Sequence, residues 1–355
     1  PARPAVRIGF TGFWDAFDPQ DNFFTRLLGR RYDVTVCDDP DFLIHSCIGR
    51  RRHDHRRHDG VRIFFTGENV PPDWHSTDWA FTFEHSAHPR HFRLPLWVLY
   101  CDPASLIKPA DLSSLAYWHD VDPLASARGF RGSARERLVQ APIDPAAVLA
   151  SKTRFCGFVV SNPLCKARND FFRRLSKYKP VDSGGKLFNT LGRRVADKRA
   201  FLAECKFTIA FENESHPGYT TEKLAEAMLA GSLPIYWGDP LVGRDFDTTS
   251  FLSAHDTPGP RMLDDLVERV VALDRDDALY RAVLARPWLR GNRVPACADA
   301  AAILDRFTTI FTTPIEPVAR RRGPARRLGL DRIPAAAASV RRRIVRRYRK
   351  LTQTA

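Results

Sequence analysis

The chain has 355 residues, of which 44% are hydrophobic and 27% are charged, and its formal net charge is +14. This composition is typical of a globular protein and excludes a disordered or membrane-spanning chain. No apolar run approaches the roughly 20 residues of a membrane-spanning helix, and residues 1–7 lack the apolar stretch of a secretory signal. We therefore expect a soluble, cytoplasmic protein of two domains.

The positive charge is concentrated at the carboxyl end of the chain. Residues 315–355 hold 13 Arg and Lys and two acidic residues, a net charge of +11, which leaves +3 of the total for residues 1–314. A nucleic-acid-binding protein would carry basic residues interleaved with aromatic ones in its body, as base stacking requires. That class is a remote alternative, and we expect no nucleic-acid partner.

Short apolar runs in the first third of the chain predict four buried strands. The runs occupy residues 6–13, 41–46, 61–66 and 79–84, with polar stretches between them. They predict an open, mostly parallel sheet with crossover helices. Ligands of such sheets bind beyond the carboxyl ends of the strands. Gly67, Glu68 and Asn69 follow the third run and are therefore in a functional position.

A second α/β series follows a long connection. Residues 102–150 are rich in Pro, Asp, Ser and Ala, and predict an irregular segment with a short helix. Beyond it we expect strands at 155–161, 207–211 and 233–237, and helices at 166–178, 198–204, 221–230 and 262–273. We divide the chain into an N-terminal domain (1–150), a C-terminal domain (151–315) and a basic tail (316–355).

The most informative stretch is FTIAFENESHPGYTTEKLAEAMLAGSLPIYWGDP, residues 207–240. Asn213 follows its first strand, and Tyr219, Glu222 and Lys223 lie where the next helix begins. A helix N-terminus offers unpaired N–H groups and a positive dipole end, which suit a diphosphate, and Lys223 adds a full charge. The alternative is structural: a threonine caps the helix, and Glu222 supports the first turn.

Four ordered segments resemble glycosyltransferase family 10, the α-1,3/1,4-fucosyltransferases. FENESHPGYTTEK (211–223) followed by LPIYWGDP is similar to the family signature F-E-N-S/T, a turn, Y-V/I-T-E-K and P-I/V-Y-W-G. CGFVVSNPLCKARNDFFRRLSKYKPVDSGGK (156–186), FNTLGRR (188–194) and FFTGEN (64–69) resemble further family segments. Two residues depart from the pattern: Glu214 replaces Ser or Thr, and Thr220 replaces Val or Ile.

The resemblance, closest to the bacterial type, implies a GT-B-like fold in which two Rossmann-like domains face each other across a cleft. It implies an inverting α-1,3(or 1,4)-fucosyltransferase that moves L-fucose from GDP-fucose to a glycan acceptor. The acceptor stays open: GlcNAc in N-acetyllactosamine and a surface polysaccharide such as lipopolysaccharide are both compatible. Transfer of another GDP-linked deoxysugar is the alternative, because the guanine and diphosphate contacts could be kept while the hexose pocket changes.

The resemblance also assigns site residues. It implies that the donor is bound by Arg168, Asn213, Tyr219, Glu222 and Lys223, and that Glu68 is the general base. The cationic side chains of Arg168 and Lys223 could offset the diphosphate charge in place of a divalent metal. We therefore expect no essential metal and no cofactor. The alternatives are that Glu68 braces a turn, and that Arg168 is an exposed helix arginine.

Four other features have structural interpretations. Residues 50–60 (RRRHDHRRHDG) could bind a metal, but the alternating arginines favour a solvated helix or loop. The acidic run 38–41 favours a surface turn, and 184–186 lacks the spacing of a phosphate loop. The seven cysteines are odd in number and dispersed, so we expect reduced, mostly buried thiols.

The tail predicts a membrane contact. In AAAASVRRRIVRRYRKL (335–351), an apolar stripe formed by Val340, Ile344, Val345, Tyr348 and Leu351 lies among arginines. A basic amphipathic helix of this kind binds anionic lipid surfaces, so we expect peripheral association with the inner face of the membrane. The alternative is a disordered, solubilising tail.

Overall fold

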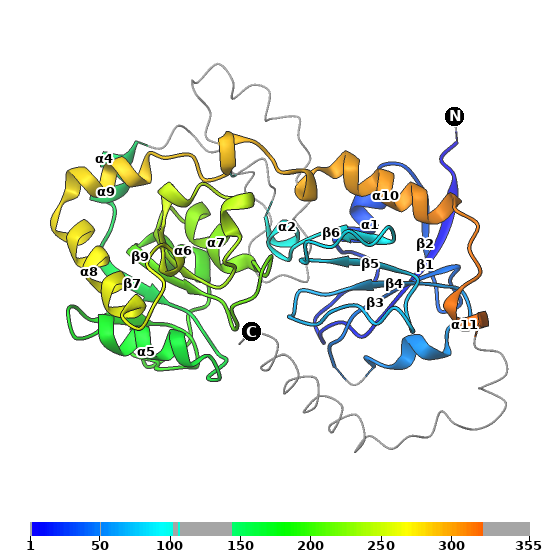
Figure 1. Cartoon of the computed structure of the whole chain (residues 1–355), viewed down its shortest axis with the longest axis horizontal. Coiled ribbons are helices and arrows are strands. Elements are labelled where there is room, and N and C mark those ends of the chain that lie inside the picture. Colours follow the sequence, from blue (N-terminus) through cyan, green and yellow to red (C-terminus); the bar gives the residue numbers. More distant parts are fainter. Residues whose placement is uncertain (1, 50, 102–105, 107–143, 322–355) are drawn as a thin grey trace.

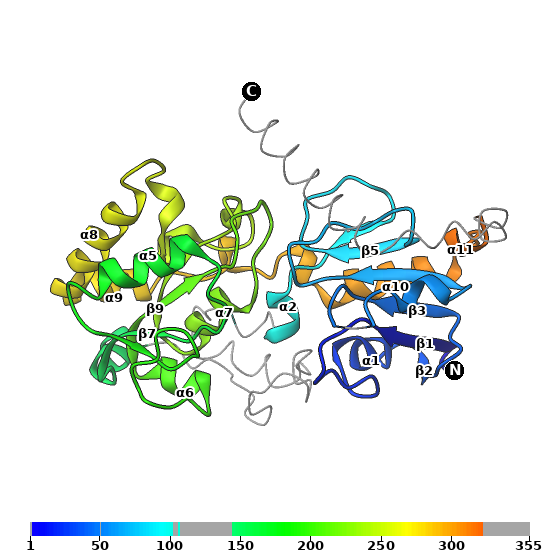
Figure 2. The same cartoon turned by 90° about the horizontal axis from the view of Figure 1, so that it is seen from below.

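The computed structural model describes residues 2–49, 51–101, 106 and 144–321. The predicted tail helix and most of the predicted connection 102–150 lie outside the described residues. The described chain forms two α/β halves that lie side by side (Figures 1 and 2).

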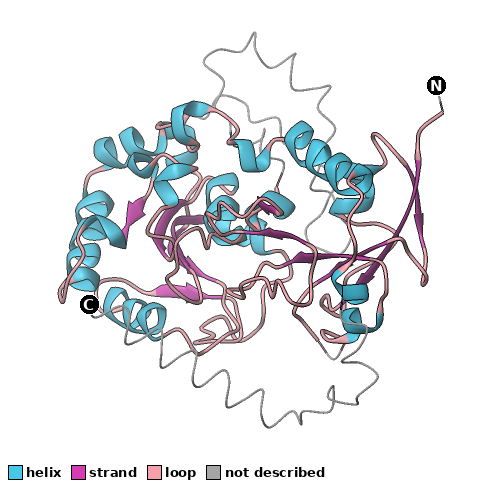
Figure 3. Ribbon diagram, turned by 45° about the vertical axis from the view of Figure 1, so that its right-hand side comes forward, coloured by secondary structure: helices cyan, strands magenta, loops and turns pink. Residues whose placement is uncertain are grey.

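The first half is built on a six-stranded parallel sheet. Its strand order is β2-β1-β3-β4-β5-β6, and each adjacent pair is parallel. Helices lie against the sheet (Figure 3), which explains why β3, β4 and β5 are buried along nearly their whole length and do not alternate between buried and exposed residues. The strands are β1 (Ala5–Thr11), β2 (Asp33–Val36), β3 (Phe42–His45), β4 (Val61–Phe65), β5 (Trp79–Thr82) and β6 (His91–Arg93).

The second half repeats this plan with a five-stranded parallel sheet of order β11-β10-β9-β7-β8. Its strands are β7 (Arg154–Phe158), β8 (Val181–Ser183), β9 (Cys205–Phe211), β10 (Leu233–Trp237) and β11 (Leu252–Ser253). The predicted strand 233–237 coincides with β10, and the predicted strand 207–211 begins two residues earlier, at Cys205.

Several helices of the described residues begin at a residue whose side chain caps them. Asn22, Asp197, Asp276 and Asp299 each cap a helix by accepting a backbone N–H bond. The helices are α1 (Phe23–Leu28), α2 (Trp97–Tyr100), α4 (Pro145–Ala150), α5 (Lys166–Leu175), α6 (Lys198–Ala203), α7 (Glu222–Leu229), α8 (Met262–Arg275), α9 (Asp277–Leu284), α10 (Ala300–Thr312) and α11 (Val318–Arg321).

The order of the second sheet fixes where a ligand can bind. Strand β7 has β8 on one side and β9 on the other. The connection from β7 to β8 therefore runs toward one edge of the sheet, and the connection from β8 to β9 crosses back to the other side of β7. At such a reversal the crossover connections diverge, and a crevice opens beyond the carboxyl ends of the two central strands. The residues that follow β7 and β9 therefore form the expected ligand site.

Helix α10 returns the chain to the first sheet. It lies within residues 151–315, which we assigned to the C-terminal domain, yet it packs on the first half (Figure 1). Phe307 stacks on Phe81 with ring centroids 4.7 Å apart, and Thr308 Oγ1 lies 2.7 Å from Tyr32 Oη. The apolar face of a helix is visible in the sequence, but the sheet that this face covers is not.

The two halves are packed directly against each other. Arg93 at the end of β6 pairs with Asp245 of the second half, with Nη2 to Oδ2 at 2.6 Å. The Trp97 and Phe246 rings meet edge to face at 5.1 Å, and both belong to one continuous buried core. The position of one sheet relative to the other is thus held by buried contacts.

The histidine-rich segment 51–60 is only partly the solvated element that we expected. It contains a short 3-10 helix, Asp54–Arg57, whose His55 is buried. The His55 ring stacks on His45 at 4.0 Å, and burial lowers the pKa of His55 to about 4. The arginine-rich pattern did not reveal that this one ring turns inward.

Candidate active site

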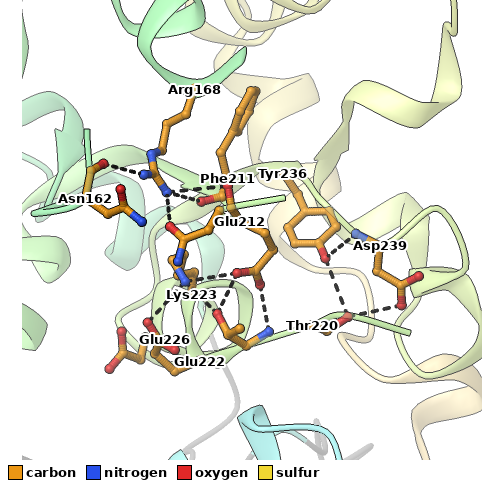
Figure 4. Close-up of polar contacts among 12 residues, drawn as sticks. Asn162, Arg168, Phe211, Glu212, Thr220, Glu222, Lys223, Glu226, Tyr236 and Asp239 are labelled. Atoms are coloured by element: carbon orange, nitrogen blue, oxygen red, sulfur yellow. Dashed lines mark hydrogen bonds and ion pairs between the residues drawn. The ribbon is translucent and has the colours of Figure 1, made fainter. Parts of the chain in front are cut away.

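Glu212 connects the carboxyl end of β9 to the start of α7. Its side chain is fully buried and accepts hydrogen bonds from Thr221 N at 2.7 Å and Thr221 Oγ1 at 2.6 Å. Lys223 Nζ lies 2.9 Å from the same carboxylate (Figure 4). Thr221 is the N-cap residue of α7, but its hydroxyl bonds Glu212 and makes no side-chain cap bond. The structural alternative of a threonine side-chain cap is therefore wrong for Thr221, because its hydroxyl donates to Glu212.

Lys223 and Glu222 are both charged at neutral pH. Burial opposes the charge on Lys223, but Glu212 and Glu222 outweigh it and raise the Lys223 pKa. Burial likewise raises the pKa of Glu222, yet the Lys223 and Lys198 ammonium groups lower it to about 2. Lys223 Nζ also contacts Thr221 Oγ1 at 2.7 Å and Glu222 Oε1 at 3.4 Å. The ammonium group is therefore fixed at the N-terminus of α7, where the helix dipole is also positive.

Arg168 joins the two central strands at the point where the sheet order reverses. From α5, its Nη2 donates to Asn162 O at 2.7 Å, beyond β7, and its Nη1 donates to Asn213 Oδ1 at 2.9 Å, beyond β9. Nη1 also donates to Phe211 O at 3.2 Å (Figure 4). The exposed helix arginine considered as an alternative is wrong, because Arg168 is 0% exposed. In this geometry Arg168 orients Asn213 and the two strand ends.

The turn before α7 is pressed against the first half. Gly218 has φ +83°, its N–H donates to Asp239 Oδ1 at 2.7 Å, and a side chain there would collide with the Phe83 carbonyl. Tyr219 is buried and meets the Phe83 ring edge to face at 5.1 Å. Asp239 also accepts from Thr220 Oγ1 at 3.2 Å. The WGDP segment thus fixes the turn that leads into α7.

Glu68 reaches this region from the first half. Its backbone N–H donates to Thr66 Oγ1 at 2.9 Å, and Gly67 lets the loop lie against Leu96, where an added Cβ would come within 2.6 Å. Glu68 is an exposed residue, but partial desolvation raises its pKa, and nearby Glu222 acts in the same direction while Lys223 opposes both. Glu68 therefore shares one electrostatic environment with the residues of α7.

The structure brings all the residues assigned from the sequence into this region, five in the second half and Glu68 in the first. Sequence reasoning assigned no role to two positioning residues, Glu212 and Asp239. Both stand in the motif segments: Glu212 directly follows β9, and Asp239 follows β10 after Gly238. It also missed Tyr100 of α2. Burial raises the pKa of this phenol, and so do the nearby Glu222 and Glu226 carboxylates.

The described residues contain neither a metal-binding cluster nor a membrane-spanning helix. Within residues 2–49, 51–101, 106 and 144–321, no group of three or more His, Cys, Asp or Glu side chains is arranged to hold a metal ion. Across the same part of the chain, every helix is too short or too polar to cross a lipid bilayer. All seven cysteines are described, and they are free thiols, five of them buried.

Comparisons with known proteins match both halves. A family profile described as "Alpha-(1,3)-fucosyltransferase FucT N-terminal domain" matches residues 8–100, and one described as "Glycosyltransferase family 10 (fucosyltransferase) C-term" matches residues 149–299. A crystal structure of an α1,3-fucosyltransferase with GDP superposes with a TM-score of 0.67 at 26% identity, covering 88% of this chain and 92% of that chain. The paired parallel sheets are thus of the GT-B type, as the resemblance implied.

Curated relatives place the chain more narrowly. It is 30% identical over 267 residues to the alpha-(1,3)-fucosyltransferase FucT of Helicobacter pylori. The matched residues make up 71% of this chain and 54% of that protein. It is 33% identical over 135 residues to the human 4-galactosyl-N-acetylglucosaminide 3-alpha-L-fucosyltransferase 9, covering 37% and 36% of the two chains. The chain belongs to glycosyltransferase family 10. It spans about half the length, or less, of these curated relatives.

Proposed function

We propose that this chain is an inverting α-1,3(or 1,4)-fucosyltransferase that moves L-fucose from GDP-fucose to a hydroxyl of a glycan. The observation that carries the proposal is that the Glu68 loop of the first half is bonded to the loop after β9, with Asn69 Nδ2 donating to Glu214 Oε2 at 2.7 Å. The charges of Glu222 and Lys223 also act on the pKa of Glu68. A carboxylate base on one side and a fixed cation at a helix N-terminus on the other are the two groups that such a displacement requires.

On the donor side, Lys223 and the N-terminus of α7 bind the diphosphate. The ammonium group already lies in place, since Glu212 and Thr221 hold it at 2.9 and 2.7 Å. A preorganised charge stabilises the departing GDP without reorganisation during the reaction. Arg168 supports this site through Asn213, and Glu222 accepts hydrogen bonds from ribose or sugar hydroxyls. We propose that these groups suffice without a divalent metal, so transfer should persist in EDTA.

On the acceptor side, Glu68 accepts the proton of the attacking hydroxyl. The environment that raises its pKa makes the carboxylate a stronger base than an ordinary glutamate. The hydroxyl oxygen then bonds to the anomeric carbon as the bond to the GDP oxygen breaks, and the proton remains on Glu68. One displacement of this kind inverts the anomeric centre and needs no sugar-enzyme intermediate. The acceptor hydroxyl is the 3-OH or the 4-OH of GlcNAc, or a hydroxyl of a surface polysaccharide unit.

The experiment is a transfer assay of the purified chain on N-acetyllactosamine with GDP-fucose, GDP-mannose or UDP-galactose, with and without EDTA. We expect a product from GDP-fucose in both conditions, and an anomeric proton signal of the α configuration, which is inverted relative to the β-linked donor. A product from another GDP-sugar would support the alternative donor. A product from UDP-galactose, or retention of configuration, would contradict the proposal.

We also propose that residues 335–351 attach the protein to anionic lipid. The support is the pattern of arginines around an apolar stripe in the sequence. Deletion of residues 322–355 should release the protein from vesicles that contain phosphatidylglycerol and leave transfer to a soluble acceptor unchanged. Equal vesicle binding by the truncated and full chains would contradict this attachment.

A further inference from the structure

In the described part of the chain, one hydrogen bond joins the loop that carries the proposed base to the loop that carries the donor segment. Asn69 Nδ2 donates to Glu214 Oε2 at 2.7 Å. Asn69 directly follows Glu68 in the loop after β4, and Glu214 directly follows Asn213 in the loop after β9. The bond therefore ties the neighbour of the base to the neighbour of a donor-site residue, across the two halves of the molecule.

The other bonds of the Glu68 loop fix it only to its own sheet. Thr66 Oγ1 accepts from Glu68 N at 2.9 Å and donates to Glu68 O at 3.1 Å, and Cys47 Sγ lies 3.2 Å from the same hydroxyl. All of these groups belong to the first half. They set the backbone of Glu68 relative to β4, whereas the Asn69–Glu214 bond sets it relative to the second half.

The bond is not what holds the two halves together. Arg93 pairs with Asp245 at a buried position, and Gly218 packs against Phe83. Both contacts lie outside the Asn69–Glu214 pair and stay when the pair is removed. Loss of the pair should therefore loosen the Glu68 loop locally, without unfolding the protein or separating the sheets.

The side chain at position 214 has the length that the bond needs. Glu214 stands where the family signature resembled by this sequence carries Ser or Thr. A serine hydroxyl ends two atoms short of the glutamate oxygens, so it would leave the Asn69 amide without this partner. Glutamine keeps the length and an acceptor oxygen, and removes only the charge.

We propose that Glu214 is a positioning residue, whose bond to Asn69 holds the Glu68 carboxylate in line with the donor segment at the start of α7. The inference rests on the proposed function for the role of Glu68. A displacement of about 1 Å in a reacting group can reduce the rate by a large factor, so even one hydrogen bond can matter for turnover. Because the pair is solvent-exposed, we expect an effect of about threefold to tenfold.

The test compares Glu214→Ser, Glu214→Gln, Asn69→Ala and the double variant Asn69→Ala/Glu214→Ser. The control is Glu268→Ser, which removes a 70% exposed glutamate of α8 that pairs only with Arg261 in the described contacts. For each protein, kcat and KM for fucosyl transfer are measured across pH, together with GDP affinity and hydrogen exchange of the residue 67–70 amides.

We expect Glu214→Ser and Asn69→Ala to lower kcat by about threefold to tenfold at unchanged GDP affinity. The double variant should be no worse than the worse single variant, because both remove the same bond. Glu214→Gln should keep the parent kcat. Both Glu214 variants should move the acidic limb of kcat/KM to lower pH, since each removes a negative charge near Glu68.

Additive losses in the double variant, or equal losses in Glu214→Ser and Glu214→Gln, would overturn the positioning role. If the parent enzyme transfers no fucose, the proposed function fails. Hydrogen exchange then still tests whether the Asn69–Glu214 bond holds the Glu68 loop in place. Faster exchange at residues 67–70 in Glu214→Ser and Asn69→Ala, with parent rates in Glu214→Gln and Glu268→Ser, supports it. Parent rates in all variants would refute it.

Discussion

Gly238 lies directly against the Cβ and Cγ atoms of the buried Glu212 side chain. A Cβ at Gly238 would come within 2.7 Å of Glu212 Cβ, so no other residue fits without moving that side chain. Glu212 in turn holds Thr221 and Lys223 at the start of α7. The glycine at the end of β10 therefore controls the position of a cation with which it has no direct contact.

Gly238→Ala should weaken donor binding. The added methyl group displaces Glu212, and the Lys223 ammonium loses its fixed position and part of its preorganisation. We expect about tenfold lower affinity for GDP, a loss of about 1.4 kcal/mol, measured by calorimetric titration. Gly243→Ala is the matched control, because its Cβ would meet only the Thr248 side chain at 3.2 Å. Parent affinity in Gly238→Ala would show that Glu212 does not position Lys223.

Lys223→Met should weaken GDP binding and slow turnover together. The substitution removes the cation that offsets the diphosphate charge and keeps much of the apolar stem. It also leaves Glu212 buried beside a neutral group, so Glu212→Gln/Lys223→Met provides the folded comparison. We expect both proteins to lose at least tenfold in GDP affinity. Equal GDP affinity in the variants and the parent would contradict the role assigned to Lys223.

The Glu222 carboxylate should make the protein acid-sensitive. Its pKa is lowered from 4.5 to about 2, in opposition to burial, by Lys223 and Lys198. The ionised group therefore stabilises the folded state above about pH 4.5, and this contribution disappears as the pH falls toward 2. It is on the order of 3 kcal/mol. Urea unfolding at pH 7 and pH 3.5 should show a smaller pH difference for Glu222→Gln than for the parent; an equal difference would contradict this account.

Arg168→Lys should destabilise the second sheet. Lysine carries the charge but not the planar fork that reaches Asn162 O, Phe211 O and Asn213 Oδ1 together. Unpaired buried carbonyls should lower the free energy of unfolding by about 2 kcal/mol. Thermal unfolding measures this loss. Arg173→Lys, at a 60% exposed position of the same helix, is the control and should unfold as the parent does. Equal stability of both variants would contradict the bracing role.

The sequence was sufficient to predict the central strands and the fold class. Residues 61–66 and 233–237 are mostly apolar, as is typical of strands buried on both faces, and they match β4 and β10. Short edge strands were missed. The runs Asp33–Val36 and His91–Arg93 are brief and polar, and only pairing with a neighbour reveals them as β2 and β6.

The site was predictable as motifs but not as a network. The sequence shows that Glu212 and Asp239 are acids that follow strands. It does not show that Glu212 bonds Thr221 or that Asp239 bonds Gly218. These pairs form only when α7 and the turn before it fold back onto the strand ends. The same limit applies to Arg168. Arg168 lies in a helix rich in basic residues, which suits an exposed position in the sequence. Its burial follows from the reversal of strand order between β7 and β9.

The most direct test of the central claim is Glu68→Gln. Glutamine has nearly the same shape but is not a base, so fucosyl transfer should fall by about 10²- to 10⁴-fold. GDP and GDP-fucose affinities, measured by calorimetry on the same preparation, should stay at the parent value, because the donor groups Lys223 and Glu222 are unchanged. A variant that keeps near-normal turnover, or loses donor binding as much as turnover, would contradict the assignment of Glu68 as the base.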